Sequence, residues 1–268
     1  MVSNLVRFLN HIIIKNKTIH SNMKYIITIF ALLFTTCIIA QTNFVTKGKI
    51  SFERRVSQFK INESDNADDN IWMEEMKKVM TKTPSDFYTL NFTEQQSYYK
   101  LVKENTDNKY MFGVLKPVES NYVLQNFAEA KTNMLRTVFE NDYQLVDSIK
   151  QYEWKITGEV RDIIGFECKK AITKICDSVI VVAFYTDQIP VKAGPENFNG
   201  LPGMILGLAV PRLAATWFAT KLEIDNEPIP SVSNKGKKVK WTDINKELSK
   251  GLKEWGKEGH SMAWLTNL

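Results

Sequence analysis

Histidine and cysteine are scarce in this 268-residue sequence, which holds three of each. After residue 40 only Cys168, Cys176 and His260 remain, so a Ser/His/Asp or Cys/His catalytic site would have to use His260, in a polar glycine-containing tail. Zinc sites need about four ligands, commonly Cys or His. The glycine fingerprints of nucleotide-binding loops are also missing. The sequence therefore predicts no metal and no cofactor, and it argues against most familiar kinds of catalytic site.

Acidic residues are missing from the first 40 positions, which carry four Lys and Arg residues. Lys24 precedes an uncharged, mostly apolar run over 25–40 that ends in Ala40, as in a signal peptide. The run is 16 residues long, short of the roughly 20 that a membrane-spanning helix needs. We expect translation to begin at Met23, so that residues 1–22 are not part of the translated protein. We expect the mature protein to begin at Gln41. The sequence thus predicts an exported protein that is periplasmic, outer-membrane-associated or secreted, with no stable transmembrane span after cleavage.

Removal of this leader changes the charge balance. The formal net charge of +5 includes four positive charges of residues 1–40, so the mature chain would carry a net charge of +1. A nearly neutral protein gives little support to nucleic-acid binding. The remaining basic cluster, Lys235, Lys237, Lys238 and Lys240, is typical of a solvated hairpin turn.

Short alternating segments dominate residues 41–268. The stretch 49–56 alternates apolar and polar residues, and 87–92 and 97–102 flank a turn as a hairpin does. Little room is left for crossover helices, so the sheet should be mainly antiparallel. We predict an α+β domain, mainly antiparallel β, with a single curved sheet or half-barrel and two short helices. Further strands are expected at 121–127, 135–139, 152–157, 166–173, 179–185, 204–209 and 216–224.

The two helices are expected near the ends of this domain. One covers 70–80, and the other begins after Thr242, where Ile244, Leu248 and Leu252 follow a helical spacing. No repeat or linker divides the chain. One domain over 41–268 is therefore expected.

The cysteines leave two alternatives open. A tight hairpin turning at Asp177-Ser178 would place Cys168 and Cys176 too far apart for a disulfide, whose Cα atoms lie within about 7 Å. A wider turn centred near Ile172 would allow the disulfide, which an oxidising compartment permits. Without it, both thiols stay free.

The segment 183–206 is unlike the rest, because it concentrates six proline and glycine residues within 14 positions. Leu201-Pro202-Gly203-Met204 suits a type II turn with positive φ at Gly203. The stretch 200–205, GLPGMI, resembles the name-giving motif of the GLPGLI family, exported proteins of Bacteroidetes-type bacteria with no established activity. Residues 165–171 and 183–195 are similar to neighbouring parts of that family, in which Trp is more usual at Phe184. The resemblance implies export and a β-rich fold.

Two interpretations of this loop remain open. Its turns can seal one end of the core, or its backbone N–H groups can line the mouth of a ligand site. In the second case Asp187 and Glu196 are weak candidates for the paired carboxylates of a hydrolase. The residues expected to form a ligand or partner loop are Ile189, Pro190, Gly194, Pro195, Asn199, Gly200, Leu201, Pro202, Gly203 and Met204.

The function expected from these observations is non-enzymatic. A curved sheet often leaves a concave apolar face, so we expect an exported cell-envelope protein that binds an apolar small molecule or a partner protein. A carboxylate-based hydrolase using Asp187 and Glu196 and a purely structural interaction module are the alternatives. Nucleic acid is not expected as a partner, and the oligomeric state is left open.

Overall fold

The computed structural model of the protein describes most of the chain after the expected leader. Residues 1–43, His260 and the apolar positions after Ile244 lie outside the described residues, as do the expected signal peptide and most of the second predicted helix. The described residues are 44–61, 67–103, 105–110, 116–138, 141–176, 178–224, 227–232, 236–244 and 246.

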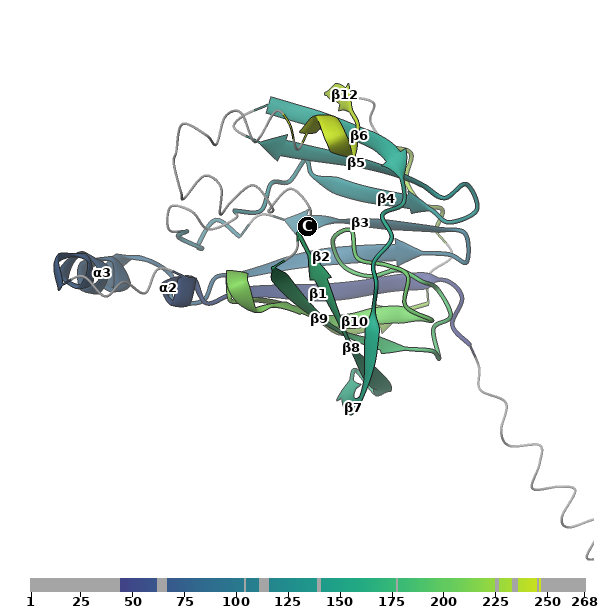
Figure 1. Ribbon diagram of the computed structural model, residues 1–268, viewed down its shortest axis with the longest axis horizontal. Coiled ribbons are helices and arrows are strands. Elements are labelled where there is room, and N and C mark those ends of the chain that lie inside the picture. The colour runs from purple at the N-terminus through teal and green to yellow at the C-terminus, as the bar shows by residue number, and fades with distance from the viewer. Residues whose placement is uncertain are drawn as a thin grey trace, which may run out of the picture. The chain divides into compact units, whose positions relative to one another are not determined.

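The described residues form one open, strongly curved sheet of twelve strands (Figure 1). Its strand order is β12-β6-β5-β4-β3-β2-β1-β11-β10-β9-β8-β7. Every pair is antiparallel except β12 with β6, so the predicted fold class is confirmed. The strands are β1 (Gly48–Val56), β2 (Ser85–Phe92), β3 (Gln96–Lys103), β4 (Tyr122–Asn126), β5 (Lys131–Val138), β6 (Asn141–Ser148), β7 (Lys155–Ile163), β8 (Phe166–Ile175), β9 (Val179–Thr186), β10 (Met204–Val210), β11 (Ala215–Glu223) and β12 (Lys237–Val239).

Three short helices accompany the sheet: α2 (Gln58–Ile61), α3 (Ala67–Val79) and the 3-10 helix η2 (Pro211–Leu213). Residues 241–244 add a helical turn where the second helix was predicted. Within the described residues, no helix has the length and apolar character needed to cross a membrane.

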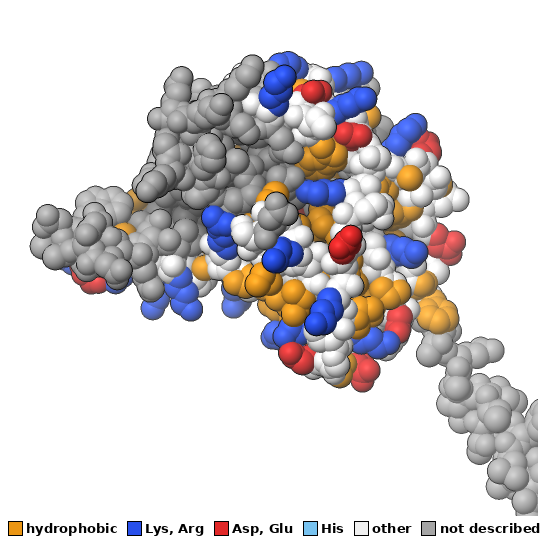
Figure 2. All heavy atoms as spheres, viewed as in Figure 1, with side chains coloured by type: hydrophobic (Ala, Val, Ile, Leu, Met, Phe, Trp, Pro, Cys, Tyr) orange, Lys and Arg blue, Asp and Glu red, His pale blue; other side chains and the backbone are white. Residues whose placement is uncertain are grey.

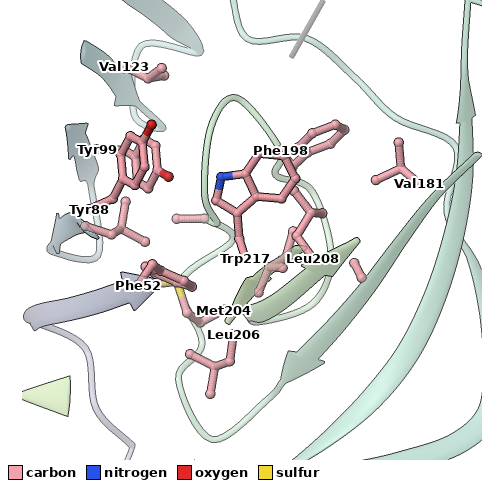
Figure 3. Close-up of a cluster of buried hydrophobic side chains, with 14 of the residues drawn as sticks. Phe52, Tyr88, Tyr99, Val123, Val181, Phe198, Met204, Leu206, Leu208 and Trp217 are labelled. Atoms are coloured by element: carbon pink, nitrogen blue, oxygen red, sulfur yellow. The ribbon is translucent and has the colours of Figure 1, made fainter. Parts of the chain in front are cut away.

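Alternation along the strands gives the sheet a buried inner side. On β1, Ile50, Phe52, Arg54 and Val56 are buried while the alternate residues 51, 53 and 55 are more exposed, as a half-buried strand requires. Side chains from both halves of the curved sheet meet inside, and in Figure 3 Trp217 of β11 lies between Phe198 and the rings on β2 and β3. The core therefore fills the concave side of the sheet.

The hairpin of β2 and β3 and the alternating strand β1 were predicted, but other elements were not. Strand β6 was missed because its sequence, NDYQLVDS, is mostly polar and gives a weak strand pattern. The strand expected at 152–157 begins and ends later in the structure, as β7 (Lys155–Ile163). The hairpin turn predicted for the basic cluster is wrong, because Lys237 and Lys238 belong to β12, which pairs with β6.

Candidate functional site

The glycine- and proline-rich loop is the densest sequence feature, and the structure places it inside the sheet. Residues 187–203, here called the plug segment, connect the neighbouring antiparallel strands β9 and β10. The segment folds into the core instead of projecting into solvent, as its green trace between the two halves of the sheet shows (Figure 1). Five of its apolar side chains are at most 2% exposed: Ile189, Val191, Ala193, Phe198 and Leu201.

Backbone hydrogen bonds fix the plug segment at both ends. The N–H of Met204 donates to the carbonyl of Ile189 at 2.9 Å, and the N–H of Ile205 donates to the carbonyl of Ala193 at 2.9 Å. The N–H of Gly200 reaches the carbonyl of Lys192 at 3.2 Å. These bonds join the segment to β10, so it is an ordered part of the sheet rather than a tether.

The type II turn predicted at Leu201–Met204 is wrong. Gly203 does not have a positive φ; that conformation occurs at Gly200 (φ 89) and at Glu196 (φ 55). Glycine is required at position 203 for a different reason, since a Cβ atom there would overlap the backbone carbonyl of Thr186. The motif glycine therefore serves close packing of two backbones.

Polar side chains hold the plug segment against the first half of the sheet. Gln125 of β4 donates from Nε2 to Oδ1 of Asn197 at 3.2 Å, and Asn197 donates from Nδ2 to the Tyr152 hydroxyl at 3.3 Å. Trp154 donates from Nε1 to the carbonyl of Asn199 at 2.9 Å. Asn197 and Asn199 are both buried, so these bonds satisfy polar groups that could not otherwise be buried.

Glu196 is the charged centre of the plug segment. Arg136 of β5 donates from Nη2 to its Oε2 at 2.9 Å, and Trp217 donates from Nε1 to its Oε1 at 3.3 Å. Arg54 of β1 lies over the same indole, with its Cζ 5.7 Å from the ring centroid. The carboxylate thus links the plug to strands on both halves of the sheet.

A second buried polar cluster surrounds Asp86. Its carboxylate accepts from the Tyr110 hydroxyl at 2.5 and 2.6 Å, from Asn108 Nδ2 at 3.2 Å, and lies 3.8 Å from Arg54 Nη1. Burial raises the pKa of Tyr88, which is close to Arg54, to about 12. The cluster keeps charges paired inside the core.

Sequence reasoning missed Arg54, Asp86 and Arg136, although two of them carried a recognisable signal. Arg54 stands between the inward positions 52 and 56, and Asp86 stands two residues before the buried Tyr88. A charge at an inward position of an alternating strand indicates a buried polar contact. No comparable pattern links Arg136 to Glu196, 60 residues away.

The structure does not bring Asp187 and Glu196 into one site. The Asp187 side chain is 56% exposed and contacts Lys169 Nζ at 2.6 Å, whereas the Glu196 side chain is 9% exposed and is bonded to Arg136. The two carboxylates contact different cations in different environments.

Most of the predicted ligand or partner loop is out of reach of solvent. Among its residues only Pro190, Gly200 and Pro202 are exposed, and Asp187 and Lys192 are the other exposed positions of the plug. The buried residues of the predicted set are Ile189, Gly194, Pro195, Asn199, Leu201, Gly203 and Met204.

The two cysteines are free thiols in the structure, Cys168 buried and Cys176 exposed. Cys168 is in β8 and Cys176 follows its last residue, and Ile175 pairs with Val179, as the tight hairpin alternative required. Eight extended residues span about 26 Å, far beyond the reach of a disulfide. The Cys168–Cys176 disulfide is not formed in this structure. Burial raises the pKa of the Cys168 thiol to about 12.

The described residues offer no cluster of three or more His, Cys, Asp or Glu side chains that could hold a metal ion. Their charged groups are arranged instead as separate pairs, such as those of Glu196 and Asp187.

Comparison with known proteins gives one match by sequence. Residues 173–207 match the model of a family described as "Protein of unknown function (Porph_ging)", and this stretch spans β9, the plug segment and the start of β10. No curated protein matches the chain.

Comparison of folds finds distant similarity to solved structures. The chain is similar to PNGF-II in two crystal forms, with TM-scores of 0.48 and 0.45, sequence identities of 16% and 13%, and coverage of 77% and 73% of this chain. It spans about a third of the PNGF-II chain, 34% and 31%. An uncharacterized conserved protein from Thermus thermophilus is similar with a TM-score of 0.37 at 7% identity, over 75% of this chain and 93% of that chain.

Proposed function

We propose that this protein is an exported, non-enzymatic envelope protein that binds a partner protein at its surface. The observation that carries the proposal is the burial of the plug segment on the concave side of the sheet. An apolar-ligand carrier would need that concave face for its ligand, and here Phe198, Leu201 and Ile189 pack into it. A surface function is therefore favoured over an internal one.

The GLPGLI assignment belongs to this proposal. It is supported by the motif at 200–205 and by the family match over 173–207, which covers the same stretch. Export is supported by the basic and apolar leader that ends at Ala40. The periplasm, the outer membrane and the extracellular space remain the compartments that such a leader serves.

Two features support a non-enzymatic role. Glu196 is engaged by Arg136 and Trp217, and Asp187 is exposed beside Lys169. Buried carboxylates in catalysis are activated by a partner group that reaches the substrate, whereas the contacts of Glu196 hold the fold together. The hydrolase alternative therefore has no support in this geometry.

The experiment is expression of the full chain in a Gram-negative host, followed by mass spectrometry of the intact exported protein and of its lipid extract. We expect an N-terminus at Gln41, no co-purified lipid and no displacement of an apolar fluorescent dye. A stoichiometric lipid or a displaceable dye would contradict the surface function and establish a carrier. An uncleaved protein retained in the cytoplasm would contradict export.

A further inference from the structure

The two edges of the sheet differ in length and in protection. Strand β12 is three residues long and forms one edge, whereas β7 is nine residues long and forms the other. In the part of the chain that the structure describes, no strand pairs with the outer side of β7. The unpaired backbone N–H and C=O groups of such an edge can accept another strand.

One side of β7 is apolar. Ile156 pairs with Ala171 and Val160 pairs with Lys169, and both partners are in register with buried residues of β9. Ile156 and Val160 therefore share the inward-facing side of the sheet, yet they are 50% and 57% exposed. These side chains lie on the edge strand of the sheet.

Strand β7 also carries two basic residues, together with Glu159, which is paired with Lys170, and Asp162. Lys155 pairs with Ile172 on the outward-facing side, and Arg161 lies over the outward rings of Phe184 and Phe218, 5.7 and 4.6 Å from their centroids. Both basic residues are exposed. Hydrophobic side chains lie among Lys, Arg, Asp and Glu side chains over the part of the molecule where β7–β10 lie (Figures 1 and 2).

These cations differ from their neighbours in being without acidic partners. Lys169 is paired with Asp187 and Lys170 with Glu159. Among the residues that the structure describes, Lys155 and Arg161 are in no ion pair. The outward side of the β7 edge therefore offers positive charge to an incoming acidic group.

We propose that β7 binds an extended segment of a partner protein as an added strand, and that this segment alternates apolar and acidic side chains. The inference rests on the proposed function and names its surface. In an added strand, apolar residues would contact Ile156 and Val160, while the alternate acidic residues would lie beside Lys155 and Arg161. The irregular register between Ile156 and Val160 limits unselective pairing at this edge.

The test uses the exported protein and two labelled synthetic peptides, one of five Val-Glu repeats and one of five Val-Lys repeats. Fluorescence anisotropy should show binding of the Val-Glu peptide at least about tenfold tighter than that of the Val-Lys peptide, weakened by added salt. Hydrogen exchange should show that the Val-Glu peptide protects backbone amides within 155–163. Equal binding of the two peptides, or no protection of those amides, overturns the proposal.

Matched variants separate the edge from the rest of the surface. Lys155→Glu and Ile156→Ser change exposed residues of β7, and Lys100→Glu and Val102→Ser change exposed residues of β3, which lies inside the sheet between two neighbours. We expect the β7 variants to weaken Val-Glu binding about tenfold and the β3 variants to leave it unchanged. Equal losses from the two pairs overturn the proposal.

Two other occupants are tested in parallel. Sedimentation of the protein without peptide should show no dimer that Ile156→Ser dissolves, and phosphatidylglycerol vesicles should not protect the 155–163 amides. A dimer that Ile156→Ser dissolves would overturn the partner-strand proposal in favour of a second copy of the chain. Protection of the 155–163 amides by the vesicles would overturn it in favour of a membrane surface. If a partner protein cross-links to another face of the molecule, only the proposal that β7 is the binding surface is overturned. If lipid is bound to the purified protein, the proposed function itself is overturned.

Discussion

The plug segment and the β7 edge strand are opposites in sequence and in placement. The plug segment has the most distinctive sequence in the chain, and most of it is buried. Strand β7 has no motif, and only Ile163 of its nine residues is buried. A conspicuous motif here reflects the packing demands of the interior, while the surface open to partners is inconspicuous in sequence.

The physical reason is that close packing in the interior restricts which residues fit at each position. In the plug, Gly203 has no space for a Cβ atom and Glu196 has two fixed hydrogen-bond donors, so few other residues fit. On β7, a Cβ atom at Gly158 would meet no heavy atom within 4 Å. Mutations should therefore separate the two regions by their effect on the free energy of unfolding.

The largest expected effect is at the Glu196–Arg136 pair. Glu196→Ala should lower the free energy of unfolding by about 3–5 kcal/mol, because it leaves a partly buried guanidinium without its carboxylate. Asp187→Ala, at the exposed pair, should cost less than about 1 kcal/mol. Urea denaturation measures both. If the two variants are equally mild, Glu196 does not anchor the plug.

The next effect compares two glycines. Gly203→Ala should lower the free energy of unfolding by about 1–3 kcal/mol, because the new methyl group overlaps the Thr186 carbonyl. Gly158→Ala on β7 should stay within about 0.5 kcal/mol of the natural protein. Thermal unfolding of the two variants gives the comparison, and a tolerated Gly203→Ala would contradict the close backbone packing.

Alkaline pH should weaken the core around the plug. Burial raises the pKa of Tyr88 to about 12 and also raises the pKa of Tyr152, whose hydroxyl accepts from Asn197. The folded state favours the neutral phenols. Their contribution to the free energy of unfolding is therefore complete below about pH 10, the pKa of tyrosine in the unfolded chain. It is lost as the pH rises from there through the pKa of the folded state. Tyrosinate absorbance should show these groups ionising only with unfolding; early ionisation in the folded protein would contradict their burial.

The smallest effect leaves stability unchanged and concerns thiol reactivity. In the folded protein, Cys176 should react with a water-soluble disulfide reagent, while Cys168 should react only after unfolding, because it is buried and its pKa is raised to about 12. Thiol titration in buffer and in denaturant gives the two counts. No reactive thiol in the unfolded, unreduced protein would instead indicate a disulfide.

Much of the fold could be predicted from local patterns. The strict alternation on β1 and the turn between β2 and β3 gave correct elements because each is set by neighbouring residues. The polar strand β6 is stabilised by pairing with β5 and β12, which no local pattern contains. The bulge of β7 likewise blurs its alternation, and its start was placed too early.

The site was only partly predictable. The proline and glycine residues of 190–203 marked this segment as unlike the rest, and sealing the core was one of the two interpretations that the sequence left open. The role of Gly203 was misjudged because steric overlap with Thr186 depends on a neighbouring strand. The contacts of Glu196 with Arg136 and Trp217 join residues 60 and 21 positions apart, so they follow from the curvature of the sheet.

The most direct test of the plug is native-state hydrogen exchange, read at single amides. The backbone amides of Gly200, Met204 and Ile205 are hydrogen-bonded in the structure, and we predict that they exchange as slowly as the core amide of Phe52, only upon global unfolding. Exchange of the plug amides many orders of magnitude faster than that of Phe52, at the rate of an open surface loop, would contradict the account and make this segment a mobile ligand mouth.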